Sequence, residues 1–226
     1  KSAAAVKPTR KQQQRSIVTQ QKLLDAAIKA FSENGFKGTS TRDIAERAGV
    51  HHPLITYHFK NKDKLWRAAA DSVFRDFRRS LATSLEYHQD ECPKQRMASM
   101  VKAYVYYAKS QPALHKVMVQ EASYASPRLD WLIETHLQPF FDATFVMIEE
   151  LQELGIAVPG NPKLLFNMIR LCSGGLLALG HELNASSSID VEDTDTLDEI
   201  ADLIVQVFLP GEFPKQAESL AGVKIE

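Results

Sequence analysis

Side chains that can bind phosphate or read the edges of DNA bases occur close together between residues 41 and 62. Arg42 can fork onto a phosphate or onto the O6 and N7 atoms of guanine. Thr41, Tyr57 and Lys62 suit phosphate oxygens, whose contacts set the register of a protein on DNA without reading its sequence. These residue types predict that the segment contacts a DNA duplex.

The charge of the chain supports a polyanionic partner for its N-terminal part. Residues 1–80 hold 17 Lys and Arg against 7 Asp and Glu, whereas residues 81–226 hold 10 against 21, so the formal net charge of −1 hides an asymmetry. A basic tail beside an ordinary acidic domain is the alternative, but the positive excess persists past the tail. Charge alone does not distinguish nucleic acid from an anionic membrane, so the motif has to decide.

The first positioning element is a short helix over residues 41–48. Ser40 and Asp43 have the spacing of a capping box at a helix start. Ile44 and Ala48 are expected on the core side, and small Ala45 allows close approach of a neighbouring helix. Gly49 suits a left-handed turn, after which Val50 is expected to plug into the core.

A second short helix is predicted over residues 52–59, with Ile55 and Phe59 buried. The residues left more exposed are His52, Pro53, Leu54, Thr56, Tyr57 and His58. His52 can donate to a base acceptor, and Pro53 and Leu54 can touch thymine methyl groups. Two short helices joined by a glycine turn form the unit that places its second helix in the major groove. A hairpin within a purely structural bundle is the alternative.

The segments Gly35-Phe36, Thr39–Val50 and Tyr57–Leu65 resemble the DNA-binding domain of TetR-family transcriptional regulators, over about residues 16–66. The resemblance implies that Thr41 and Arg42 contact backbone and base, that the residues exposed on the second helix form the recognition surface, and that Lys62 meets a phosphate. Many members carry Tyr where this chain has Thr56, whereas here the aromatic residue is Tyr57.

Helical spacing recurs along the rest of the chain and strand signals are scarce, which predicts an all-α fold of about nine helices. Pro139 is expected to kink a long helix over residues 127–154. The predicted organisation is a flexible basic arm (1–15), a helix-turn-helix domain (16–62), an effector-binding and dimerisation domain (63–211) and a tail (212–226). Arg10, Lys11 and Arg15 of the arm either follow the DNA or remain solvated.

A homodimer is predicted from the C-terminal helices and is implied by the resemblance. Residues 162–184 are apolar on more than one face, so this helix is expected to be buried on all sides. Together with residues 196–209 it would form a four-helix interface across a two-fold axis, which suits a palindromic operator with two half-sites. The predicted interface residues are Leu164, Met168, Leu171, Gly175, Leu179, Leu197, Ile200 and Ile204.

An apolar effector pocket is predicted among the middle helices, because Met and aromatic side chains form adaptable linings. Each such residue taken alone is more often ordinary core. The predicted lining is Met97, Met100, Tyr104, His115, His136, Phe140, Phe141, Met168 and Cys172. Tyr104, His115 and His136 would be its polar groups.

Other chemistries lack their signatures. His51, His52 and His58 have no Asp or Cys partners at metal-ligand spacing. No GxSxG, P-loop, GxGxxG or zinc motif occurs, so neither an enzyme nor a cofactor or metal is expected. The two cysteines, the lack of an apolar leader and the shortness of the longest apolar run, residues 171–180, favour the cytoplasm.

The sequence therefore predicts a DNA-binding regulator, a repressor that a small and largely apolar effector releases from its operator. The effector would favour a conformation whose recognition helices no longer fit the half-sites, with the long helix from Asp63 as the lever. The alternative is an effector-free architectural or cell-cycle protein of the same fold.

Overall fold

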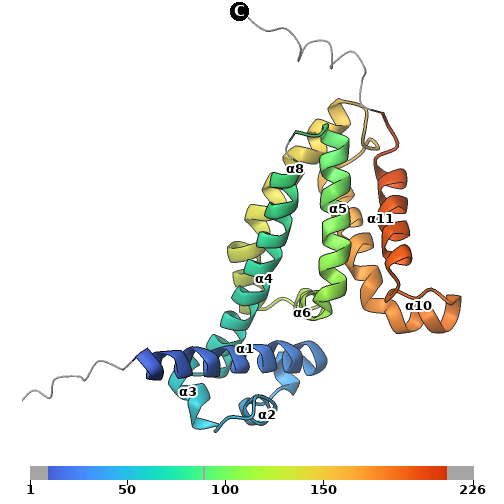
Figure 1. The fold of residues 1–226 in the computed structure, drawn as a ribbon. Coiled ribbons are helices and arrows are strands. Elements are labelled where there is room, and N and C mark those ends of the chain that lie inside the picture. Colours follow the sequence, from blue (N-terminus) through green and yellow to red (C-terminus); the bar gives the residue numbers. More distant parts are fainter. Residues whose placement is uncertain (1–9, 89, 213–226) are drawn as a thin grey trace, which may run out of the picture. The chain divides into compact units, whose positions relative to one another are not determined.

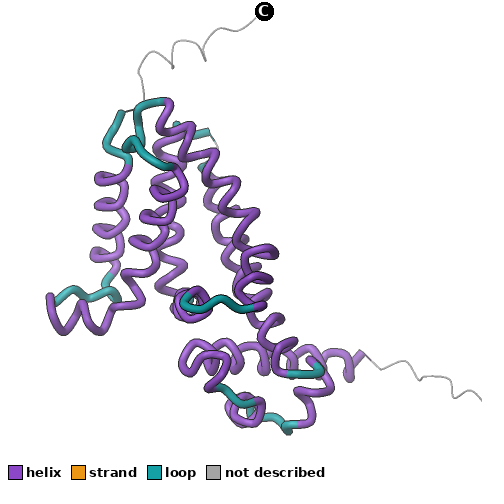
Figure 2. The backbone as a smooth tube through the Cα atoms, turned by 180° about the vertical axis from the view of Figure 1, so that it is seen from behind, coloured by secondary structure: helices purple, strands orange, loops and turns teal. Residues whose placement is uncertain are grey.

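The computed structural model describes residues 10–88 and 90–212, and every regular element in them is a helix (Figure 2). The predicted all-α fold is confirmed. The contacts within the chain group it into two units, Lys1–Arg75 and Asp76–Glu226. The predicted division after residue 62 stays a prediction. Residues 1–9 of the predicted arm and 213–226 of the predicted tail lie outside the described residues.

The N-terminal unit contains α1 (Arg10–Gly38), α2 (Thr41–Arg47), α3 (Pro53–Phe59) and the beginning of α4 (Lys62–Tyr87), all shown in Figure 1. Helix α1 begins earlier than the sequence predicted, so Arg10, Lys11 and Arg15 lie on helical turns rather than on a flexible arm. It bends at Gly35, where φ is 67°. Apolar side chains from all four helices form the core of this unit: Leu23, Ala27, Phe31, Ile44, Ile55, Phe59, Leu65 and Trp66.

Two small polar side chains stabilise the junction between α1 and α2. The Ser40 hydroxyl accepts a hydrogen bond from the Asp43 backbone N–H at 3.0 Å, so the predicted cap of α2 is present. The buried Thr39 hydroxyl lies 3.0 Å from the carbonyl oxygen of Ala30 and 2.7 Å from that of Gly35. These contacts fix where α2 begins relative to α1.

The turn between α2 and α3 depends on Gly49, whose φ of 64° is in the left-handed region that favours glycine. Ile44 and Ala45 are buried, whereas Ala48 and Val50 are only half-buried. The expectation that Ala48 and Val50 reach the core is therefore wrong. Ile44 and Ala45 are the residues of α2 that reach the core.

The C-terminal unit contains the last turns of α4 and a series of further helices. These are α5 (Pro93–Ser110), α6 (Pro112–Ala122), α7 (Pro127–Leu132), the π-turn η1 (Ile133–Leu137), α8 (Gln138–Glu153), α9 (Pro162–Arg170), the π-turn η2 (Leu171–Gly175), the 3-10 turn η3 (Leu176–Leu179), α10 (Gly180–Ser187) and α11 (Thr194–Phe208). Helix α5 packs against α11 and α6, and α8 packs against α9 (Figure 1).

Two long helical stretches of this unit are interrupted, the first near the kink predicted at Pro139 and the second within the stretch 162–184, which was predicted as one continuous helix. The π-turn η1 comes just before Pro139, which lies in the first turn of α8 and has no backbone N–H to donate. The second interruption, η2 and η3, follows α9. Proline also occupies the first turn of α5, α6, α7 and α9, a position where its missing N–H costs nothing.

The stretch 162–184, which lies within the helical span Pro162–Ser187, is predicted to be buried on all sides, and in this chain it is not. Leu164, Met168, Leu171 and Leu179 are each more than half exposed, whereas Ser173 and Gly174 face the interior. Among the described residues this is the stretch long and apolar enough to cross a membrane by length and composition alone, a test that core helices of soluble proteins also pass.

Candidate DNA-binding surface and effector cavity

Helix α3 presents one polar face because its apolar residues are used by the core. Ile55 and Phe59 are 2% and 5% exposed, as predicted. They are four residues apart and therefore lie on the same side of the helix. His52, Pro53 and Thr56 are exposed, and Tyr57 is 77% exposed. Leu54 and His58 are half-buried, so they lie at the border of this face.

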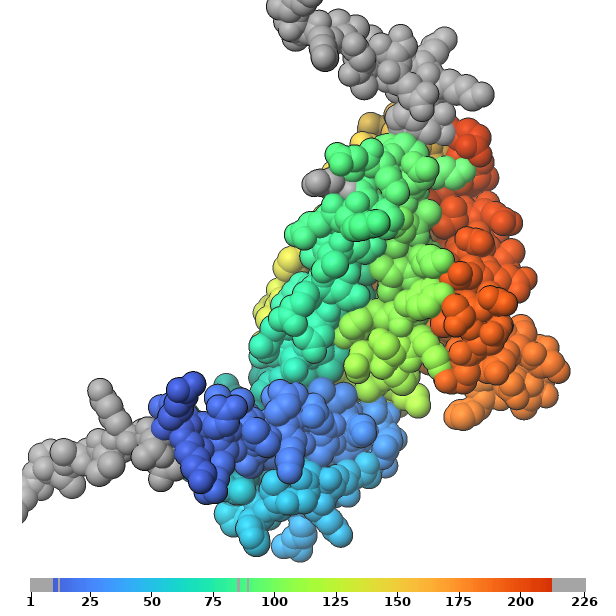
Figure 3. Space-filling view, viewed as in Figure 1, coloured from blue at the N-terminus to red at the C-terminus, as the bar shows by residue number. Residues whose placement is uncertain are grey.

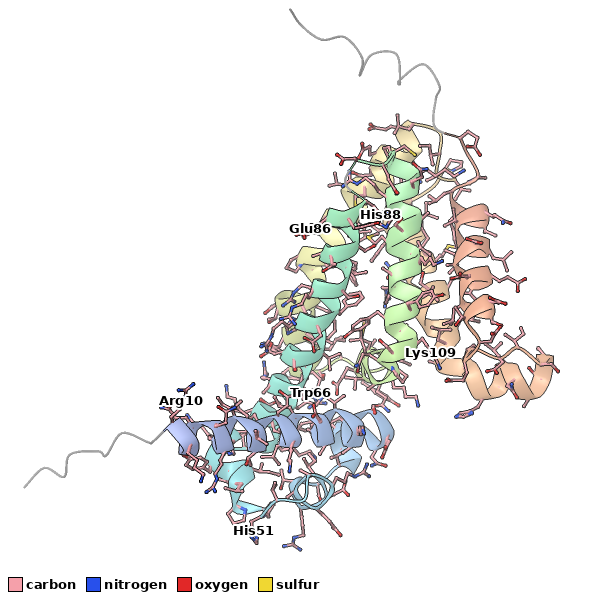
Figure 4. The ribbon with its side chains drawn as sticks, viewed as in Figure 1. Arg10, His51, Trp66, Glu86, His88 and Lys109 are labelled. Atoms are coloured by element: carbon pink, nitrogen blue, oxygen red, sulfur yellow. The ribbon has the colours of Figure 1, made fainter. Side chains whose placement is uncertain are left out.

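The first residues of α2 and α3 are linked to each other. The Thr41 hydroxyl and Nε2 of His52 are 3.0 Å apart and hydrogen-bonded. The bond joins two residues predicted to contact DNA, and it holds them on the same side of the turn. Arg42, the next residue of α2, is exposed. Figure 4 shows His51, which precedes His52, on the turn that leads into α3.

Lys62 is held at the first turn of α4. Its ammonium lies 4.4 Å from the centroid of the Phe36 ring, a cation–π contact. The Asn61 side chain accepts a hydrogen bond from the Lys64 backbone N–H at 2.9 Å, which caps the helix at this point. Lys60 ends α3 with a φ of 68°. These contacts hold the backbone and the side chain of Lys62, the residue predicted to meet a phosphate, at the start of α4.

The imidazole of His58 packs edge-to-face with Tyr57, at 4.9 Å between ring centroids. Burial lowers the pKa of His58 from its ordinary value, because the charged form loses hydration. At neutral pH this ring is therefore uncharged and can both donate and accept a hydrogen bond.

The C-terminal unit encloses a cavity of about 20 Å³. Its lining residues come from α4, α5, α8, α9 and η2: Leu81, Met97, Met100, Val101, Tyr104, Phe140, Thr144, Ile148, Phe166, Ile169, Arg170 and Ser173. Met97, Met100, Tyr104 and Phe140 were predicted from the sequence. The volume is room for about one water molecule.

The other predicted pocket residues are not in this lining. His115 and His136 are buried, Phe141 and Cys172 are half-buried, and Met168 is 53% exposed on α9. His136 accepts a hydrogen bond from Arg78, with Nη1 2.9 Å from its Nδ1, so it serves a contact between α4 and η1. Periodicity alone did not tell the inner face of these helices from the outer one.

Sequence reasoning missed Arg170, which is the charged residue of the lining. Its signal was present, because Arg170 is the one charged residue between positions 164 and 180, and a charge in such an apolar stretch has to be paired, exposed or functional. Burial raises the pKa of Tyr104 above its usual range, while the charge of Arg170 and its hydrogen bond to the phenol act in the opposite direction.

An exposed apolar face follows α9, η2 and η3. It is formed by Leu164, Met168, Leu171 and Leu179. On α11 the exposed apolar residues are Leu203 and Val207. Leu197, Ile200 and Ile204, which were predicted for the interface, are instead 3%, 8% and 6% exposed, because this side of α11 packs on α5. Helices α10 and α11 form the orange-to-red surface in Figure 3.

Within residues 10–88 and 90–212, no group of three or more His, Cys, Asp and Glu side chains is placed to hold a metal ion. The three histidines at the start and end of α3 therefore form no such cluster with acidic or thiol side chains.

Comparison with known proteins agrees with the helix-turn-helix geometry. The model of the family "Bacterial regulatory proteins, tetR family" matches residues 23–69, which span the end of α1, all of α2 and α3, and the start of α4. RutR of Escherichia coli strain K12, an HTH-type transcriptional regulator, is 22% identical over 93% of this chain and 98% of its own length. YttP of Bacillus subtilis strain 168, a probable HTH-type transcriptional regulator, is 24% identical over 54% of this chain and 58% of its own length.

The fold of most of the chain is shared with solved structures. AibR, crystallised with isovaleryl coenzyme A and operator DNA, superposes with a TM-score of 0.67 at 16% identity, covering 86% of this chain and 100% of AibR. The matched helix-turn-helix, the RutR alignment along nearly the full length and the shared fold agree with one another. Residues 23–69 of this chain are therefore a helix-turn-helix segment of the tetR family of bacterial regulatory proteins.

Proposed function

We propose that this protein is a homodimeric repressor that binds a palindromic operator and leaves it when a small, largely apolar molecule enters the C-terminal unit. The observation that carries the proposal is the face of α3, where exposed Tyr57 and Thr56 lie beside the hydrogen-bonded pair Thr41 and His52. Such a face fits the major groove, and the exposed Arg42 can reach a phosphate or a guanine.

The dimer is proposed to form through the exposed apolar face of α9, η2 and η3 with Leu203 and Val207 of α11. Contiguous exposed apolar surface on a globular protein marks an interaction site. A palindromic operator has two half-sites. A two-fold dimer supplies a second recognition helix for the second half-site, about 34–36 Å from the first. Leu197, Ile200 and Ile204 are left out of this proposal because they are buried within the chain.

The coupling of effector to DNA is proposed to run through α4. This helix carries Lys62 in its first turn and Leu81, which lines the cavity, about five turns later. A ligand that moves Leu81 changes the position of Lys62 only if it binds one of two states more tightly than the other. AibR, a structure of the same fold, was crystallised with both isovaleryl coenzyme A and operator DNA, which supports this proposal.

The adaptable methionine and aromatic lining favours a ligand-responsive regulator over an effector-free architectural protein. The proposal includes no catalytic step. We also propose that the protein acts in the cytoplasm, where bacterial DNA is accessible to it.

The test is fluorescence anisotropy with DNA from upstream of the protein's own gene and with a scrambled duplex, across a series of salt concentrations. Preferential, salt-dependent binding to the native duplex is expected, because phosphate contacts release counterions. Equal binding to both duplexes would favour an architectural protein. Binding to neither would contradict the proposed DNA-binding function.

A further inference from the structure

The cavity of the C-terminal unit has four polar residues in its lining, and two of them use their hydroxyls in hydrogen bonds to the backbone. Its lining is apolar except for Tyr104, Thr144, Arg170 and Ser173. The hydroxyls of Thr144 and Ser173 donate to the backbone carbonyls of Phe140 and Ile169, each at 2.8 Å. Arg170 and Tyr104 are therefore the lining groups that can offer hydrogen bonds to a ligand.

The contacts of Arg170 with the described residues are to uncharged side chains. Its Nη2 donates to the Asn167 side chain at 3.0 Å, its guanidinium lies 5.6 Å from the centroid of the Phe141 ring, and it hydrogen-bonds the Tyr104 phenol. Nε is buried and has no hydrogen-bond partner. Among the described residues no carboxylate lies within ion-pair distance of Arg170, as the ion pairs involve other residues.

A half-buried guanidinium with five N–H donors and no anionic partner is a costly arrangement in an apolar surrounding. Its positive charge acts on the neighbouring groups: after burial, it is the second cause that lowers the pKa of His115 to about 4. An anion in the cavity would neutralise this charge. A carboxylate fits best, because a guanidinium can bind its two oxygens side by side.

We propose that the cavity binds a small molecule with one carboxylate on an apolar chain, the carboxylate held by Arg170 and Tyr104 and the chain by Met97, Met100 and Phe140. This inference rests on the proposed function and specifies the chemical class of its effector. It narrows the small, largely apolar effector proposed above to an amphipathic anion.

The cavity of about 20 Å³ is too small for such a molecule unless its lining moves. Met97 and Met100 have flexible unbranched side chains, and Phe140 belongs to a cluster of rings with Phe77, Phe141 and Phe166. Methionine fills irregular spaces and repacks readily. A ligand that fits only the expanded lining binds one conformation in preference to the other, which is the condition for shifting a two-state equilibrium.

The experiment measures the melting temperature of the full chain with butanoate, hexanoate, octanoate or decanoate and with the primary alcohol of the same length. The proteins compared are the wild type, Arg170→Met and Arg96→Met. Arg96 is the matched control: it is also half-buried and its Nε also has no hydrogen-bond partner, but it does not line the cavity.

At least one carboxylate is expected to raise the melting temperature of the wild type and of Arg96→Met, and to do so more than its alcohol. In Arg170→Met the affinity for that carboxylate should fall by about tenfold or more, since hydrogen bonds to charged groups are among the strong ones, while binding of the alcohol persists. Arg170→Lys, which keeps the charge but loses the fork, should retain part of the preference. The inference is overturned if no carboxylate binds, if alcohols bind equally well, or if Arg170→Met keeps the preference.

A second measurement separates this inference from the proposed function. The carboxylate that stabilises the wild type is added to the complex with operator DNA, and anisotropy is followed. Release of DNA supports both proposals. Stabilisation without release supports the carboxylate site and contradicts effector control of DNA binding, whereas release by the alcohols alone supports effector control and overturns the carboxylate site.

Discussion

The imidazole of His115 on α6 lies directly against the backbone of Gly174 in the π-turn η2. A Cβ atom placed on Gly174 would be 2.0 Å from Nε2 of His115. His115 is 4% exposed, and this Nε2 has no hydrogen-bond partner. Glycine at position 174 therefore lets α6 approach η2 closely, and the approach occurs within one chain rather than between two.

Gly174→Ala is expected to lower the free energy of unfolding by about 1–3 kcal/mol, because the added methyl group overlaps a buried ring that has little room to move. Gly175→Ala is the control, since its Cβ would meet Leu171 at 3.7 Å, an ordinary contact. Urea denaturation of both variants checks this. Equal stability of the two would contradict the packing of His115 on Gly174.

The stability of the protein should fall as the pH drops from about 6.5 to about 4. Burial, and then the charge of Arg170, lowers the pKa of His115 to about 4. In the unfolded chain the same group titrates at its ordinary value near 6.5. Between these values the unfolded chain binds a proton that the folded chain does not, so the free energy of unfolding decreases by up to about 3 kcal/mol.

Denaturation at several pH values, compared between the wild type and His115→Leu, tests this origin. The variant should show a flatter pH dependence in that window. His181→Leu, which replaces an exposed histidine on α10, should keep the wild-type dependence. A pH dependence that survives in His115→Leu would assign the effect to another group.

Arg42→Ala should weaken binding to operator DNA by about 1–3 kcal/mol, if the guanidinium contacts a guanine, and should leave the dimer intact. Arg79→Ala serves as the control, because Arg79 is also exposed but belongs to the C-terminal unit and pairs with Asp76 at 3.5 Å. Anisotropy measures the affinity, and sedimentation measures the dimer. An operator affinity equal to that of the wild type would remove Arg42 from the contact surface.

Lys62→Met should reduce the slope of log affinity against log salt concentration by about 1, since one phosphate contact is lost. Methionine keeps the apolar stem that rests beside Phe36 while removing the charge 4.4 Å from its ring. Lys116→Met, at an exposed site on α6, should leave the slope unchanged. A slope unaltered in Lys62→Met would mean that this ammonium meets no phosphate.

Leu171→Glu should shift the protein from dimer toward monomer, because a carboxylate would have to be desolvated in the apolar interface. Leu171 is 52% exposed, and Val119 on α6 is 54% exposed, so Val119→Glu is a control of matched exposure. Sedimentation velocity distinguishes the two species. A dimer that persists in Leu171→Glu would place the interface on another face of the chain.

The sequence by itself determined the helix-turn-helix. The cap at Ser40, the left-handed turn at Gly49 and the burial of Ile55 and Phe59 all depend on neighbours within a few turns of the same segment. Capping and turn chemistry are local, and the spacing of two residues on a short helix fixes which face they share. The helical character of the remaining chain followed from periodicity in the same way.

Only the tertiary structure decided which of two apolar faces a helix turns inward. Ile200 and Leu203 on α11 are equally apolar, but Ile200 packs on α5 while Leu203 is 49% exposed. Likewise, Arg170 becomes a cavity residue through the placement of Tyr104 and Phe140 from two other helices. Periodicity describes a helix about its own axis, whereas burial and charge pairing depend on partners that are distant in the chain.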